Sequence, residues 1–141
     1  MTIIEAITHL LKHTTAVAQI VGDRIYPEVL PQNPTYPAIV YHLIATDPDH
    51  TQDGPSGYTR KLVQFDYVAR TAADVEAISR GVRIAMDGLK GLIGEVPQDD
   101  DDPDQVTVFA CFRSGERSDY DDEFKIHLRI ADFEVHFDEE H

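Results

Sequence analysis

The chain has 141 residues, a single cysteine, and a formal charge of −14 that arises from 12 basic and 26 acidic residues. The length predicts one domain over residues 1–141 with one core. The charge excludes ordinary binding to nucleic-acid phosphates, and one cysteine excludes an internal disulfide framework or a zinc finger. No apolar run approaches the roughly 18 residues of a membrane span, and the first residues lack a secretory signal pattern, so we expect no membrane partner and synthesis in the cytoplasm.

The chain begins with apolar residues at helical spacing. Thr2 is placed to cap a helix, with Glu5 three residues later, and this pattern predicts a helix over about residues 2–12. A short second helical turn over 14–20 stays open, because Thr14-Thr15 interrupts the pattern before Gly22 ends it. The apolar positions are Ile4, Ile7, Leu10, Leu11, Val17, Ile20 and Val21.

A linker with prolines at positions 27, 31, 34 and 37 follows and should run extended along the surface. Residues 38–45 and 60–69 are then β-rich, and we expect them to pair antiparallel. In the second run, Val63, Phe65, Tyr67 and Ala69 share one face. The connection from Asp47 to Tyr58 is longer than an ordinary hairpin loop, and we expect it to be a loop that makes a contact.

The second half predicts one helix and two strands. Thr71 caps the helix, whose apolar stripe runs from Val75 to Leu89 before Gly88 or Gly91 ends it. An acidic loop at 97–104 precedes strands near 106–113 and 123–137, which a polar segment with Gly115 joins. The last strand changes apolar phase, and a β-bulge near Ala131–Asp132 would bring its apolar residues to one face.

This order predicts an α+β fold. The sequence of elements is α-β-β-α-β-β, which we interpret as an antiparallel four-stranded β-sheet with two helices packed on one face.

More than half of the acidic residues fall in four segments without periodicity. We interpret these segments as solvated loops and an acidic tail at 138–141 that favour solubility. The residues are Asp47, Asp49 and Asp53; Asp99 to Asp102 with Asp104; Glu116, Asp119, Asp121, Asp122 and Glu123; and Asp138, Glu139 and Glu140.

The sequence contains no recognisable catalytic motif. HExxH, a nucleophile elbow and a phosphate-binding glycine loop are missing, and Asp47, Asp49, Asp53 and Gly54 have EF-hand residue types without EF-hand spacing. We therefore expect no enzyme activity, no cofactor and no metal.

The histidines and the cysteine also fit structural roles. His127 and His136 are expected on a shared polar face of the last strand, where they would be solvated or at an interface. His42 is expected to be partly buried within its strand, and Cys111 to be a buried thiol.

Several segments together resemble the tail-completion, or tail-terminator, proteins of long-tailed bacteriophages and phage-like gene transfer agents. The resemblance rests on the order and spacing of the segments and covers residues 2 to about 90. The segments are Gly22-Asp23-Arg24-Ile25-Tyr26-Pro27, Leu30-Pro31-Gln32, Tyr36-Pro37-Ala38-Ile39-Val40-Tyr41, Asp53-Gly54-Pro55-Ser56-Gly57, Val63-Gln64-Phe65-Asp66-Tyr67 and the helix from Ala73 to Gly88.

The resemblance implies a structural virion protein that caps the tail tube as a ring, usually six-fold, stops its growth and joins the tail to the head connector. Its partners would be further copies of itself, the tail tube protein and the connector protein, with genome DNA passing through the lumen without specific binding. The protein would be assembled in the host cytoplasm and located in the virion tail or neck. Expected interface residues are Arg24, Tyr26, Asp47, Asp49, Asp53, Gly54, Pro55, Ser56, Gly57 and Tyr58.

Three alternatives stay open at this point. One is another head-tail neck or connector component, which would bind on the portal side. Another is an acidic protein that mimics DNA and inhibits a nucleic-acid-binding protein. The third is a small hydrolase or metal enzyme with dispersed catalytic residues.

Overall fold

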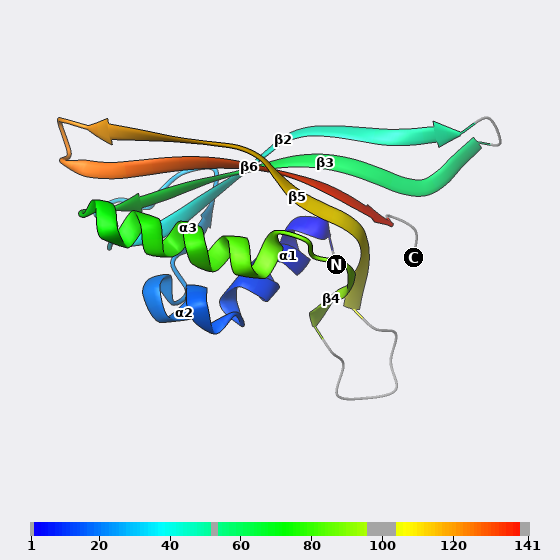
Figure 1. Cartoon of the computed structure of the whole chain (residues 1–141), viewed down its shortest axis with the longest axis horizontal. Coiled ribbons are helices and arrows are strands. Elements are labelled where there is room, and N and C mark those ends of the chain that lie inside the picture. Colours follow the sequence, from blue (N-terminus) through cyan, green and yellow to red (C-terminus); the bar gives the residue numbers. More distant parts are fainter. Residues whose placement is uncertain (1, 52–53, 96–103, 139–141) are drawn as a thin grey trace.

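The computed structural model describes residues 2–51, 54–95 and 104–138, so Asp53, most of the predicted acidic loop and the end of the tail lie outside the described residues. The described part forms a layer of helices beneath a long curved sheet (Figure 1). None of the described helices is long and apolar enough to cross a bilayer. The elements are α1 (Ile3–Lys12), α2 (Thr15–Val21), β1 (Ile25–Pro27), β2 (Ala38–Thr51), β3 (Gly54–Ala69), α3 (Ala72–Met86), β4 (Gly91–Glu95), β5 (Asp104–Asp121) and β6 (Ile126–Asp138).

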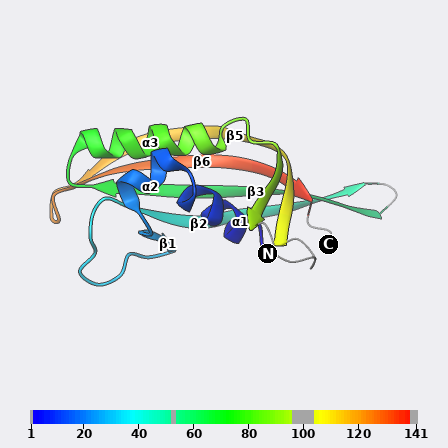
Figure 2. The same cartoon turned by 90° about the horizontal axis from the view of Figure 1, so that it is seen from below.

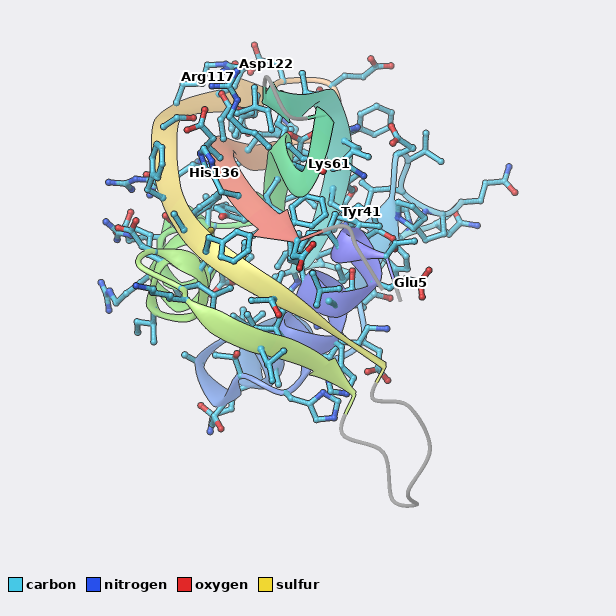
Figure 3. The ribbon with its side chains drawn as sticks, turned by 90° about the vertical axis from the view of Figure 1, so that its right-hand side faces the viewer. Glu5, Tyr41, Lys61, Arg117, Asp122 and His136 are labelled. Carbon is cyan, nitrogen blue, oxygen red and sulfur yellow. The ribbon has the colours of Figure 1, made fainter. Side chains whose placement is uncertain are left out.

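The sheet differs from the one that the sequence predicted. Its six strands have the order β1-β2-β3-β6-β5-β4, and β1 runs parallel to β2 while the other pairs are antiparallel. Figure 3, which views the molecule from the right-hand side of Figure 1, shows the sheet curling around the helices. The prediction of a four-stranded antiparallel sheet with two helices was therefore wrong. β1 and β4 have only three and five residues, too few to show a strand pattern.

The helices begin where their capping residues predicted. Thr2 accepts a hydrogen bond from the Glu5 amide, and Thr71 accepts one from the Asp74 amide. α2 settles the open question of a second turn. It packs against α3 so closely that a Cβ added at Gly81 would lie 2.7 Å from the carbonyl oxygen of Ala16. All three helices lie on one face of the sheet (Figure 2).

The main core fills the space between this face and the helices. Its largest members are aromatic: Phe65 stacks on Tyr67 with ring centroids 6.3 Å apart, and Phe133 meets Phe65 edge-on at 5.7 Å. The predicted inward face of β3 is confirmed, since Val63, Phe65, Tyr67 and Ala69 are all buried. Cys111 on β5 is buried as well, at 3% exposure, as expected.

A second apolar cluster lies on the opposite face of the sheet and explains the phase change of the last strand. Ala38, Val68 and Ile126 form its centre, and Leu128 packs against it. β6 pairs with β3 in unbroken register from Asp138 to His127, so the predicted bulge near Ala131–Asp132 was wrong. β6 changes phase because its first residues bury apolar side chains on one face and its later residues on the other.

The bulges lie in other strands. β5 shifts register between Val108 and Ala110 and between Arg113 and Gly115, and β2 shifts between Leu43 and Ala45 and between Pro48 and His50. Gly115 is thus part of a long strand, and the predicted polar connection around it does not form. Because β6 has no bulge, His127 and His136 are an odd number of residues apart on a regular strand and lie on opposite faces, contrary to prediction.

Candidate assembly surfaces

The expected loop between Asp47 and Tyr58 is a projecting β-hairpin. β2 continues to Thr51 and β3 begins at Gly54, with Thr51 opposite Gly54 and Asp47 opposite Arg60. We call residues 46–51 and 54–58 the arm. β6 pairs with β3 only as far as Tyr58, so within the described residues the rest of the arm pairs only with itself and extends beyond the helices (Figure 1).

The arm holds most of the interface residues that the sequence predicted. Asp47 and Asp49 lie on β2, and Gly54, Pro55, Ser56, Gly57 and Tyr58 lie on β3; Asp53 lies outside the described residues. An isolated two-stranded hairpin is at best marginally stable in water, so a surface that packs against it would stabilise it. Among the described residues, the arm beyond Tyr58 receives no strand pairing from other elements, and an interface role for it stays a prediction.

Arg24, also an expected interface residue, makes two internal hydrogen bonds. Its Nε donates to the Pro37 carbonyl oxygen at 2.8 Å and its Nη2 to the Ile20 carbonyl oxygen at 3.0 Å. The backbone carbonyl of Arg24 also accepts from the Ile39 amide at 3.0 Å. These bonds tie the end of α2 to the end of the proline-rich linker and the start of β2.

Tyr26 lies on β1 and packs, half-buried, against the second apolar cluster. Like Arg24, it contributes to holding the linker on the sheet. An interface role for either residue stays a prediction.

His42, on β2, connects the proline-rich linker to β3 through its two ring nitrogens. Its Nδ1 lies 3.1 Å from a Glu28 carboxylate oxygen and its Nε2 lies 2.9 Å from an Asp66 carboxylate oxygen, so a protonated ring donates to both. Burial lowers the pKa of His42, but the hydrogen bonds to Asp66 and Glu28 outweigh burial, and the pKa lies above its ordinary value. The expectation of a partly buried, hydrogen-bonded histidine is confirmed.

A polar layer lies between α3 and the sheet. The buried Ser79 hydroxyl donates to Glu116 at 2.5 Å, and Arg113 donates to the other Glu116 oxygen at 2.8 Å. Nearby, Arg129 on β6 forms an ion pair with Glu76 on α3. The buried hydroxyl of Tyr67 has no hydrogen-bond partner in the described structure, and burial raises its pKa.

A surface hollow lies at the end of the molecule that is opposite to the arm. It has a volume of about 440 Å³ and is lined by Asn33, Pro34, Tyr36, Arg70 and Phe124. The Arg70 guanidinium lies over the Tyr36 ring at 5.0 Å from its centroid, and Phe124 is 63% exposed. Sequence reasoning missed this site, because its walls come from three separate segments: the linker, the end of β3 and the β5–β6 turn.

In the part of the chain that the structure describes, no three histidine, cysteine, aspartate or glutamate residues are grouped so that they could hold a metal ion. His136 hydrogen-bonds to Glu134 at 3.0 Å and stacks near Phe112, while His127 meets Tyr120 edge-on. Figure 3 labels His136 on β6 and Lys61 on β3.

Residues 5–137 match the protein family described as "Tail completion protein gp17". The chain belongs to the tail-completion family. The match extends the resemblance, which the sequence carried to about residue 90, through the C-terminal strands. As a tail-completion protein, it is a structural component of the virion tail of a phage or phage-like particle.

A solved structure supports the fold of this tail-completion protein. A chain from "Virion of native gene transfer agent (GTA) particle" aligns with a TM-score of 0.67 and 12% identity, covering 94% of this chain and 91% of that chain. At this identity the likeness shows the fold alone. No curated protein matches the sequence.

Proposed function

We propose that this protein caps the tail tube as a ring of six copies, ends tube growth and presents a surface to the head connector. The family match over residues 5–137 carries the proposal. A cap of this kind needs no catalysis. It needs heterologous contacts between copies that close by rotation, and one ring face that does not accept another tube subunit.

In this proposal the arm makes the contacts with the tube or with neighbouring copies. Its projection beyond the helices, without pairing to other described elements, favours that role (Figure 1). A variant that joins Pro48 to its pairing partner Thr59 through a two-residue turn removes residues 49–58, most of the arm, and keeps β3 from Thr59 onward. We expect it to fold and to leave tails uncapped; normal capping by this variant would contradict a role for the arm.

The negative charge suits a passage for DNA. Acidic side chains that line the ring would repel phosphates and let the genome pass without sticking. Replacing Asp99 to Asp102 with asparagine tests whether this segment contributes: DNA retention on isolated rings should then rise at low salt, and unchanged retention would argue against a lumen role for these four residues.

Electron microscopy of particles made without this protein, and then with it restored, tests the main proposal. We expect overlong or headless tails in its absence and tails of uniform length with a terminal ring when it is present. Normal tails that fail only to bind heads would favour the connector alternative, and gold labelling on the head side of the joint would support that outcome.

A further inference from the structure

We propose that His9 and His13 form a chelating site for one late transition-metal ion, such as Zn²⁺, Ni²⁺ or Cu²⁺. His9 lies in the last turn of α1 and His13 is the residue that caps its C-terminal end. Their imidazole rings stack with centroids 4.1 Å apart. The site lies within one copy of the chain, so it does not depend on the proposed ring.

The spacing of the two histidines is one that helices use to bind metals. Residues four positions apart are neighbours on a helix surface, and HExxH sites hold zinc with a histidine pair at this spacing. The segment here reads His9-Leu10-Leu11-Lys12-His13, so it lacks the glutamate that acts as a base in HExxH enzymes. The pair therefore favours metal binding without that chemistry. The expectation of no metal considered only motifs with a full set of ligands.

The hydrogen bonds of the pair leave ring nitrogens available to a metal ion. His13 Nδ1 lies 2.8 Å from the His9 carbonyl oxygen. Since a carbonyl oxygen only accepts, Nδ1 carries the proton of the neutral His13 ring, and Nε2 keeps its lone pair. Metal-binding histidines commonly donate their other ring nitrogen to a carbonyl in this way. The His9 ring makes no hydrogen bond to any described residue.

The two rings are close to the separation that a chelate requires. Two imidazoles with metal–nitrogen bonds of about 2.0 Å that meet at a right angle have ring centroids about 4.5 Å apart. The observed separation is 4.1 Å, and the ring planes differ by 26°. The rings must turn to point at one ion, and they have room to do so because neither belongs to the buried core. Water molecules can complete the coordination of the metal.

The charges around the pair favour a cation. The site lies at the C-terminal end of α1, which is the negative end of the helix dipole, and the whole chain has a charge of −14. Lys12 is the basic neighbour on α1 and opposes a cation. Its side chain is exposed, so solvent and salt screen this repulsion.

The other histidines with described side chains have different partners. The ring nitrogens of His42 face two carboxylates, His136 bonds to Glu134, and His127 meets Tyr120 edge-on. Within residues 2–51, 54–95 and 104–138, His9 and His13 alone bring two imidazole rings together. Imidazole ligands select Zn²⁺, Ni²⁺ or Cu²⁺ over Mg²⁺ and Ca²⁺, which prefer oxygen.

Titration calorimetry of the full chain with NiCl₂ tests the site. Excess Mg²⁺ is present throughout, so that the many carboxylates are occupied by a cation that prefers oxygen. We expect one Ni²⁺ per chain. His9→Gln and His13→Gln should each weaken binding at least about tenfold, because each leaves a single ligand in place of a chelate. The matched control is His127→Gln, which should bind Ni²⁺ like the wild type.

Two results would overturn the site. Wild-type affinity in the His9→Gln/His13→Gln double variant would place the metal elsewhere on the chain. A loss below about threefold in either single variant, with an unchanged melting temperature, would mean that the two histidines bind separately and form no chelate.

Electron paramagnetic resonance with one equivalent of Cu²⁺ gives an independent readout. Copper binds nitrogen sites more tightly than the other divalent ions of its row, and its spectrum reports the nitrogens that it contacts. We expect coupling to two imidazole nitrogens in the wild type and to one in His9→Gln. Identical spectra for the two proteins would contradict the proposed chelate.

Discussion

The buried Ser79 hydroxyl on α3 donates a hydrogen bond of 2.5 Å to the Glu116 carboxylate on β5, so a helix and a strand that are 37 residues apart are joined by one polar contact. Glu116 also accepts from Arg113. The carboxylate thus keeps its charge compensated although it lies partly beneath the helix.

Removing the buried hydroxyl of Ser79 and removing that of Tyr67 should affect the stability of the protein differently. Ser79→Ala leaves Glu116 without one of its donors and should lower the free energy of unfolding by about 1–3 kcal/mol. Tyr67→Phe removes a hydroxyl that has no partner among the described residues and should leave stability unchanged or raise it. Urea unfolding of both variants checks the pair; a loss of similar size for Tyr67→Phe would mean that its hydroxyl is satisfied.

The close approach of α2 to α3 predicts that glycine is more stabilising than alanine at position 81, the reverse of the usual order in a helix. Alanine normally stabilises a helix relative to glycine by up to about 1 kcal/mol. A Cβ at position 81 would instead meet the Ala16 backbone, which a flexible side chain cannot relieve, so Gly81→Ala should destabilise by about 1–3 kcal/mol. Thermal unfolding measures the change, with Arg80→Ala on the exposed side of α3 as the control.

Arg24 should matter for the stability of the isolated subunit. Arg24→Met removes two charge-assisted hydrogen bonds to backbone carbonyls and should cost about 2–4 kcal/mol, while Arg24→Lys should recover only part of it. Unfolding is measured at a concentration where the protein is monomeric. If Arg24→Met leaves the monomer as stable as wild type and impairs only assembly, the predicted interface role holds instead.

The His42 contacts predict a pH-dependent contribution to stability. The pKa of His42 is raised above its ordinary value of 6.5 in the folded protein, so its stabilising effect is complete below 6.5 and is lost as the pH rises through the folded pKa. His42→Gln should therefore cost more stability at pH 5.5 than at pH 9. His13→Gln, whose ring contacts no carboxylate in the described structure, is the control. An equal cost at both pH values would show that His42 acts only through packing.

Cys111 should resist thiol reagents in the folded state. Burial is the main cause that raises its pKa to about 12, so almost no thiolate exists at pH 8. Labelling with a chromogenic disulfide reagent should be at least about 100-fold slower in buffer than in denaturant. Rapid labelling of the native protein would mean that β5 opens locally.

Local signals predicted the helices well, because capping acts over only a few residues. Thr2 and Thr71 each lie three residues before the amide that they accept from, and the stripe on α3 repeats at helical spacing. The inward face of β3 followed from its alternation in the same way. These features can be predicted from neighbouring residues alone, without knowing which distant residues they contact.

The features that the sequence did not reveal depend on contacts between distant residues. Proline and glycine at positions 48, 54, 55 and 57 are typical of turns, and only the pairing between β2 and β3 makes that segment a hairpin. The phase change of β6 has no local cause, because Ile126 is buried by Ala38 and Val68 from other strands. Arg70 and Tyr36 form the hollow for the same reason: the linker and the end of β3 meet only in the folded chain.

The separation of the arm from the core has a consequence for how such a protein can evolve. Beyond Tyr58, where the pairing of β3 with β6 ends, the backbone of the arm pairs only with itself among the described residues, so a substitution near its tip need not disturb the strands of the body. Lineages can therefore lengthen, shorten or rewrite the arm while the body stays intact. Exchange of this one hairpin between relatives is a route by which the same body could acquire a different assembly partner.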